Sequence, residues 1–331
     1  MKSLPIVLSA AIAVSATAVV AASTPSLESG REATRLLFAQ EAETLAARFS
    51  PAFLEEIGGV EGVVQFLSAV AQQAGPEQEI LSEEAFHEAG QTSYYRRSRF
   101  EKMPDVTTTW VIDDAGVIQA GSVRPTQAPA PSNHLDYRTK ASLRLPLEAP
   151  AEGAWYVGWG GRDLIHNYHA ATRDQRFAYD LYVAHDGMPY RTDGKANEDY
   201  YCFGLPILAP AGGTVASAVD GLPDNPPGTM DPENAVGNHV VIDHGNGEFS
   251  FLAHLQRGTV LPREGDRIEA GERVGLCGNS GNTSMPHLHY HLQTTARFAE
   301  GEGLPAQFNG YRANGQPVER GEPVRGEFIE P

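Results

Sequence analysis

The stretch MPHLHYHLQ, residues 285–293, places three histidines at every second position near the end of the chain. Successive side chains of a β-strand point to opposite faces, so His287, His289 and His291 share one face of the predicted strand. Imidazoles two residues apart are separated by ~6.6 Å at their bases, so one could bind a metal while its neighbour reaches what the metal binds. A polar strand face in contact with water has the same pattern, and the stretch alone leaves its chemistry open.

Other segments predict further strands of this kind. Short runs of β-branched residues, separated by glycine and proline, recur from residue 206 onward. Such spacing predicts a mainly antiparallel β domain with tight turns. FAYDLYV, residues 177–183, surrounds Asp180 with aromatic and aliphatic residues, and FSFLAHL, residues 249–255, ends an apolar strand with His254. Burying an unpaired carboxylate is costly, and a cation would offset that cost.

The first third of the chain has a different pattern. Between residues 26 and 75 apolar side chains recur three and four positions apart, which predicts helices. Residues 92–125 then alternate as strands do, with turn residues at 113–116. We therefore predict a small α+β domain over residues 26–125, with helices followed by an antiparallel sheet. Its order of elements resembles a nuclear-transport-factor-like cone fold. Its one histidine, His87, is expected to be a surface or capping residue on a helix.

The segments at either end of this small domain are also distinctive. Residues 1–22 begin with a lysine, continue as an apolar run and end in small residues, which predicts a signal peptide cut after Ala22. The run falls short of the ~20 apolar residues that span a bilayer. We expect an exported protein of the periplasm, cell envelope or extracellular space that does not span a membrane. A proline-rich linker at 126–135 leads into a β-rich domain over residues 136–331.

Charge and cysteine content narrow the range of partners. The 331 residues include 25 basic and 42 acidic side chains, a net charge of −17, which would repel a nucleic acid backbone. We therefore expect no nucleic acid partner. Cys202 and Cys277 are the only cysteines. In an oxidising compartment they could form a disulfide, but the sequence does not show whether they come within bridging distance.

Residues 136–295 resemble the zinc metallopeptidases of family M23, the lysostaphin and LytM type. The family's landmarks stand here as His169 with Asp180, as LAHL at 252–255, and as GNSGNTSMPHLHYH at 278–291. The resemblance implies that His169, Asp180 and His289 bind one Zn²⁺ per chain. It also implies that two further histidines act as catalytic residues beside the metal position, namely His254 and His287.

Two features depart from the common pattern of the family. The spacing from His169 to Asp180 is longer than usual, so the extra residues AATRDQR, 170–176, should form a loop. The choice of His169 over His166 as a ligand rests partly on the preceding residues NY. His291 stands where many members carry an acidic residue. It could be a hydrogen-bond partner of a ligand or an exposed side chain, and we expect the exposed side chain.

The resemblance implies an exported zinc-dependent endopeptidase whose substrate is the peptide part of peptidoglycan, most plausibly its cross-links. A second reading is a non-catalytic LytM-like binding module that activates a cell-wall amidase. A third is a secreted protease that acts on glycine-rich proteins. Regulators of the second kind usually lack several ligand residues, whereas all five positions are filled here, which favours an enzyme. Protein partners are not indicated.

Overall fold

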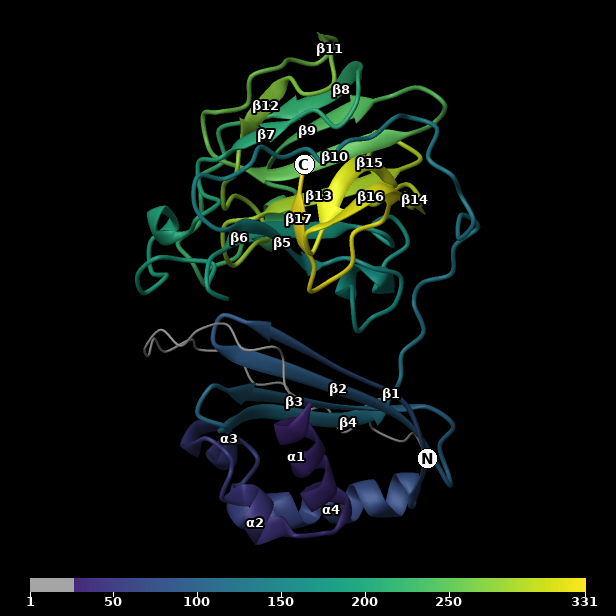
Figure 1. The fold of residues 1–331 in the computed structure, drawn as a ribbon, viewed down its shortest axis with the longest axis vertical. Helices are drawn as coiled ribbons and strands as arrows, with labels where there is room; N and C mark the ends of the chain where they lie inside the picture. The colour runs from purple at the N-terminus through teal and green to yellow at the C-terminus, as the bar shows by residue number, and fades with distance from the viewer. Residues whose placement is uncertain (1–26) are drawn as a thin grey trace. The chain divides into compact units, whose positions relative to one another are not determined.

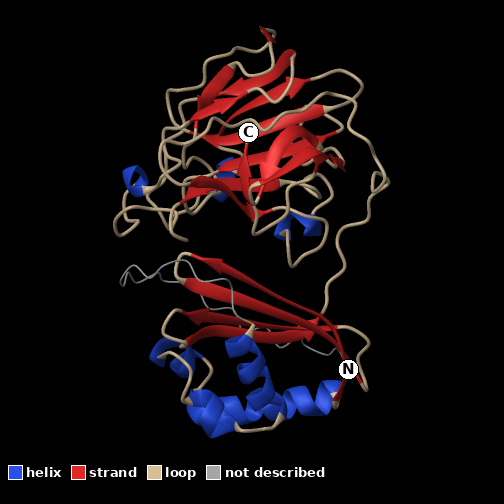
Figure 2. Cartoon of the chain, in the orientation of Figure 1, coloured by secondary structure: helices blue, strands red, loops and turns tan. Residues whose placement is uncertain are grey.

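The computed structural model describes residues 27–331, and the predicted signal peptide lies outside the described residues. The chain divides into two compact units, and the boundary along the sequence lies between Gln127 and Ala128. Figure 1 labels their helices and strands, and Figure 2 shows that the second unit consists of strands joined by loops and a few short helices. Among the described residues, no helix combines the length and apolar character that membrane crossing requires.

The first unit is a four-stranded antiparallel sheet with helices against one face (Figure 2). The strand order is β1-β2-β3-β4. Its elements are α1 (Glu28–Phe38), α2 (Ala42–Ala46), α3 (Pro51–Glu56), α4 (Gly59–Ala74), β1 (Glu77–Glu88), β2 (Gln91–Phe100), β3 (Val106–Asp113) and β4 (Ile118–Pro125). Helices followed by an antiparallel sheet are therefore present, whereas the cone-like resemblance stays a prediction.

The helices pack on the sheet through two large aromatic side chains that are fully buried, Tyr94 and Trp110. The Trp110 indole N–H donates a hydrogen bond to Thr34 Oγ1 of α1 at 3.0 Å. A Cβ atom at Gly30 would lie 2.1 Å from the Tyr94 ring, so α1 can approach the sheet this closely only with glycine there. This packing explains why the apolar helix faces predicted from the sequence are buried.

The sequence pattern did not predict strand β1, which is rich in glutamate. β1 pairs with β2, and ion pairs across the two strands join Glu77 to Arg96 and Glu79 to Arg99. The strand therefore forms because its charges meet opposite charges on a neighbour distant in sequence. The expectation that His87 lies on a helix is wrong, because His87 is part of β1.

The second unit contains one large sheet and a small two-stranded one. The large sheet has the order β11-β8-β9-β10-β13-β6-β5-β17-β15-β16, with β14 on β13, and β12 pairs with β7. The strands are β5 (Ala154–Trp159), β6 (Tyr179–Ala184), β7 (Pro206–Leu208), β8 (Gly213–Val219), β9 (Asn238–Asp243), β10 (Phe249–Leu255), β11 (Arg267–Ile268), β12 (Arg273–Leu276), β13 (Leu288–Gln293), β14 (Gly303–Leu304), β15 (Phe308–Ala313), β16 (Gln316–Gly321) and β17 (Phe328–Glu330). Three short 3₁₀ helices join them, η1 (Tyr168–Ala171), η2 (Asn197–Asp199) and η3 (Pro232–Asn234). All pairings between the named strands are antiparallel.

The histidine-rich stretch forms β13, which lies in the middle of the large sheet between β10 and β6. Leu288, Tyr290 and Leu292 point into the hydrophobic core and are at most 1% exposed. The histidines are on the opposite face, as the alternation predicted. The register sets His289 opposite Asp180 of β6. The position of β13 therefore decides which side chains meet on the histidine-bearing face.

Candidate metal centre

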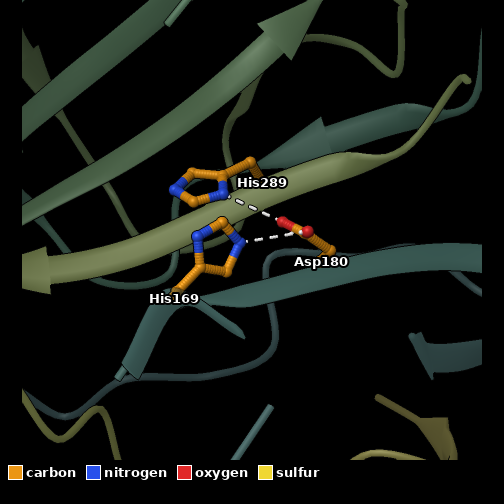
Figure 3. A group of neighbouring side chains, drawn as sticks. All are labelled: His169, Asp180 and His289. Atoms are coloured by element: carbon orange, nitrogen blue, oxygen red, sulfur yellow. Dashed lines mark hydrogen bonds and ion pairs between the residues drawn. The ribbon is translucent and has the colours of Figure 1, made fainter. Parts of the chain in front are cut away.

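His169, Asp180 and His289 form a compact cluster of buried side chains (Figure 3). The His289 Nδ1 atom lies 2.9 Å from Asp180 Oδ1, and the His169 Nε2 atom lies 3.0 Å from Asp180 Oδ2. One nitrogen or oxygen atom from each residue lies within 4.8 Å of the others. Two imidazoles and a carboxylate are a donor set that binds zinc and leaves a fourth position open, so the residues present fit this ion.

His169 reaches the cluster from the loop before β6 because Asn167 anchors that loop. The fully buried Asn167 accepts a hydrogen bond from the His169 backbone N–H at 3.1 Å and donates one to the Ala178 carbonyl oxygen at 3.0 Å. His166 pairs instead with Asp163, their closest atoms 2.9 Å apart. The structure therefore brings His169 to Asp180 and leaves His166 outside the cluster.

His254 and His287 lie beside the cluster, with ring centroids 5.0 Å apart. The His254 Nδ1 atom is 2.8 Å from the Ser280 carbonyl oxygen, and the His287 Nδ1 atom is 2.9 Å from the Met285 carbonyl oxygen. A carbonyl oxygen only accepts, so Nδ1 carries the proton in each ring. The Nε2 atom of each neutral ring is then free to accept a proton. The His287 Nε2 atom is 3.4 Å from Asp180 Oδ1.

His254 has an unusual backbone conformation. Its φ angle is +62°, and the pairing of β10 with β9 shifts register between Leu252 and Leu255. A non-glycine residue in this region carries backbone strain of the kind that clusters at functional sites. Ser280 supports this conformation from the glycine-rich turn, and a Cβ atom at Gly237 would lie 2.2 Å from the Ser280 carbonyl oxygen. Glycine at position 237 therefore lets the turn hold the His254 ring.

Burial and charge act in opposite directions on the ionisable groups of the site. Burial raises the pKa of the Asp180 carboxyl, but the charges of His169 and His287 and their hydrogen bonds outweigh it and hold that pKa well below its usual value. Burial, with His287 and His289 nearby, holds the pKa of His254 well below its usual value. Burial lowers the pKa of His287, but Asp180 outweighs burial and raises it. Asp180 is therefore a carboxylate, and His254 is neutral near pH 7.

His291 is buried, at 1% exposure, so the alternative of an exposed side chain is wrong. Its ring stacks on Phe251 of β10, with centroids 4.4 Å apart and an interplanar angle of 15°. Its Nδ1 atom lies 2.9 Å from His289 Nε2. The pairing of Phe251 with His291 across two strands produces this burial, and a local sequence pattern does not show such a pairing.

The structure adds side chains that the sequence did not single out. Tyr168, half exposed, stacks on His169 with centroids 4.0 Å apart, and its hydroxyl donates a hydrogen bond to Asp180 Oδ2 at 3.3 Å. Asn167 and Ser280 hold His169 and His254. Tyr168 could have been found from the sequence, because it directly precedes the site residue His169. The roles of Asn167 and Ser280 depend on contacts that only the fold creates.

The two cysteines lie next to the strand that carries the histidines. The buried thiols of Cys202 and Cys277 are unpaired, with Sγ atoms 2.7 Å apart. The Cys202 thiol also faces the Pro286 carbonyl oxygen at 3.2 Å, one residue before His287. The two side chains are thus close enough for a disulfide to form under oxidising conditions, and that bond stays a proposal.

The fold and this cluster define a class: a mainly antiparallel β domain with a candidate catalytic metal site. Comparison with known proteins agrees with the class, because the model of Peptidase family M23 matches residues 197–300. Over this segment the chain is similar to peptidase family M23. The segment contains His254, His287 and His289, whereas His169 and Asp180 precede it. Asp180 reaches the site through the pairing of β6 with β13, and His169 reaches it from η1.

Curated relatives agree with this family. Peptidoglycan DD-endopeptidase ShyA of Vibrio cholerae is 43% identical over 61 residues, which cover 18% of this chain and 14% of the relative. Peptidoglycan DD-endopeptidase ShyC of the same organism is 34% identical over 89 residues, covering 27% of this chain and 19% of the relative. Cell division protein DipM of Caulobacter vibrioides is 25% identical over 166 residues, covering 50% of this chain and 22% of the relative. The aligned segments therefore span less than a quarter of each of these relatives.

Proposed function

We propose that the protein is an exported zinc-dependent endopeptidase that hydrolyses peptide bonds in peptidoglycan cross-links. The observation that carries this proposal is the meeting of His169, Asp180 and His289 within 4.8 Å, beside two further histidines whose Nδ1 atoms face backbone carbonyl oxygens. The relatives named as peptidoglycan DD-endopeptidases support the substrate class. The predicted signal peptide supports a location in the periplasm, cell envelope or extracellular space.

In this mechanism His169, Asp180 and His289 would hold one Zn²⁺, which would supply Lewis-acid activation of water and of the scissile carbonyl. The side chains of the protein supply proton transfer and orientation. His254 and His287 share the proton transfers, since one accepts the proton of the attacking water and one gives a proton to the leaving amine. Their Nδ1–H groups stay on backbone carbonyl oxygens, which leaves the Nε2 atom of each ring for proton transfer.

Burial of the cluster contributes to this chemistry. The side chains of His169, Asp180 and His289 are each at most 7% exposed. Little water surrounds such groups, so their electrostatic interactions with a reacting amide are stronger than at the surface. Tyr168 is the half-exposed side chain in contact with the cluster, and it is the group that a substrate arriving from solvent would meet first.

The second candidate is a non-catalytic binding module that activates a cell-wall amidase. The similarity to a protein named for cell division, which extends over half of this chain, favours keeping it. The complete donor set favours the enzyme, because a module that only binds needs neither the three clustered ligands nor the strained His254.

Digestion of purified sacculi separates the two functions. Wild type should release soluble muropeptides with newly cut cross-links, identified by mass spectrometry, and a chelator or His289→Ala should abolish the release. His185→Ala is the matched control, because His185 pairs with Glu152 away from the cluster. Equal release by wild type and His289→Ala would overturn the enzymatic proposal. Stimulation of an amidase that persists in His289→Ala would favour the binding module.

A further inference from the structure

A row of polar side chains leads away from the candidate ligand His289 along the same face of β13. The row consists of His289, His291 and Gln293, which alternate with the buried apolar residues of the strand. All three are at most 5% exposed. Buried polar side chains are nearly always hydrogen-bonded, because an unpaired one is costly to bury. Three in succession therefore point to an ordered chain of hydrogen bonds.

At the outer end of the row, the donor and acceptor atoms of the Gln293 amide are fixed by its hydrogen bonds. The Gln293 amide nitrogen donates to the Thr295 carbonyl oxygen at 2.9 Å and to the Arg297 carbonyl oxygen at 2.8 Å. Both amide hydrogens are therefore used, and Gln293 Oε1 is left as an acceptor. This oxygen and the Nε2 atom of His291 are both buried, and neither has a hydrogen-bond partner among residues 27–331. A hydrogen bond from a His291 Nε2–H to Gln293 Oε1 would satisfy both atoms, and the Gln293 side chain acts on His291 as an acceptor does.

The inner end of the row then follows. When His291 carries its proton on Nε2, its Nδ1 atom is an acceptor. That atom lies 2.9 Å from His289 Nε2, so His289 donates from Nε2 and keeps its lone pair on Nδ1. Nδ1 is the atom of His289 that faces Asp180 Oδ1, at 2.9 Å. Each hydrogen bond in the row therefore determines whether the next side chain donates or accepts.

We propose that His291 and Gln293 are positioning residues that hold His289 in the tautomer whose Nδ1 lone pair is available to a metal ion. The inference rests on the proposed zinc site. Residues that hydrogen-bond the free nitrogen of a metal-binding histidine fix its tautomer and ring orientation, and their loss typically weakens metal binding ~10- to 100-fold. His291 and Gln293 touch neither substrate nor metal in this role and act only through His289.

Stacking of His291 on Phe251 offers a competing explanation, in which the His291 ring only fills space. Two substitutions separate the explanations because they predict opposite orders. His291→Phe keeps an aromatic ring on Phe251 and removes the acceptor. His291→Asn removes the ring and keeps an amide oxygen close to the position of Nδ1. If His291 fixes the tautomer of His289, His291→Asn should bind Zn²⁺ more nearly like wild type than His291→Phe does. If His291 only packs, the order of the two variants should be reversed.

The measurements are the Zn²⁺ dissociation constant, by competition with a chromophoric chelator, and the visible spectrum of the Co²⁺-loaded full chain. Circular dichroism of the metal-free proteins establishes that each variant is folded. We expect His291→Phe to weaken Zn²⁺ binding by ~10- to 100-fold and to alter the Co²⁺ bands, and His291→Asn to weaken binding by less than about tenfold. Gln293→Met should weaken binding in the same direction, and it replaces His291→Phe in the comparison if that variant does not fold.

The possible results bear on two separate claims. Wild-type protein that binds no Zn²⁺ would overturn the proposed function and the positioning role together. Wild type that binds Zn²⁺ while His291→Phe binds equally well would overturn the positioning role alone. A larger loss in His291→Asn than in His291→Phe would assign His291 to packing and would also overturn it.

Discussion

The two units differ in the kind of polar side chain that they bury. In the described part of the first unit the buried polar side chains are all small hydroxyls: Thr34, Ser50, Ser98, Thr107 and Thr108. The second unit buries ionisable groups, among them His169, Asp180, Glu248, His254, His287, His289 and His291. A hydroxyl is satisfied by a nearby backbone oxygen, as Thr34 is by Gly30. A buried ionisable group needs a specific partner, so the second unit is where chemistry is expected.

The largest effect should come from Asp180→Ala in the second unit. Asp180 lies between His169 and His289, so its removal leaves two imidazoles without the carboxylate that joins them. We expect the zinc content to fall from about one ion per chain to near zero and hydrolysis to fall to the level of chelator-treated wild type. Elemental mass spectrometry and sacculus digestion measure both, with Asp163→Ala as control. Full zinc content in Asp180→Ala would show that the Asp180 carboxylate is not a metal ligand.

His254→Ala should separate catalysis from metal binding. The His254 ring is 5.7 Å from the His289 ring and is not one of the three clustered ligands. Turnover is expected to fall by ~10²- to 10⁴-fold, the usual contribution of a proton-transferring side chain, while the zinc content stays at the wild-type level. Initial rates and metal analysis of the same sample provide the measurement. Parallel loss of zinc and rate would make His254 a ligand instead.

In the first unit, Trp110→Ala should change stability and leave metal binding unchanged. Trp110 is fully buried and donates a hydrogen bond to Thr34, so its removal leaves a cavity and takes one donor from the Thr34 hydroxyl. The local free energy of unfolding should fall by about 3–5 kcal/mol. Hydrogen exchange followed by mass spectrometry measures this loss in peptides of residues 27–127. A changed Zn²⁺ affinity in this variant would contradict the view that metal binding depends on the second unit alone.

The smallest effect concerns Glu248, a buried carboxylate of the second unit that serves structure. Glu248 accepts hydrogen bonds from the Tyr137 hydroxyl at 2.8 Å and from the backbone N–H groups of Lys140 and Ala141 at 2.6 and 2.8 Å. Tyr137→Phe leaves the two backbone donors in place and should cost about 1–2 kcal/mol of unfolding free energy, measured with denaturant. An unchanged free energy at pH 7 would contradict this role.

The hydrogen bond between Tyr137 and Glu248 also predicts that the free energy of unfolding depends on pH. Burial and the hydrogen bond to Glu248 raise the pKa of Tyr137 to about 12, above the value of about 10 in an unfolded chain. A raised pKa means that the stabilisation is complete below pH ~10 and is lost as the pH rises toward ~12. The stability difference between wild type and Tyr137→Phe should therefore shrink over this range. A constant difference would contradict the assignment.

The sequence predicted those parts of the fold that depend on local periodicity. Strand β13 alternates apolar and polar residues, and β6 and β10 are short apolar runs that contain one or two polar residues, so Asp180, His254 and His289 could be placed on strands. Strand β1 was missed because its glutamates give no apolar alternation, and the arginines of β2 that pair with Glu77 and Glu79 lie elsewhere in the sequence. The burial of His291 was missed because it depends on stacking against β10. Local patterns therefore predict elements, whereas long-range pairing decides which side chains are buried together.

The account depends most on one metal ion held by His169, Asp180 and His289. Anomalous diffraction at the zinc absorption edge, from crystals of the full chain grown with Zn²⁺, tests this directly. We predict one strong peak within bonding distance of His169 Nε2, Asp180 and His289 Nδ1. A map with no peak there, or with the zinc bound only by other side chains, would contradict the account.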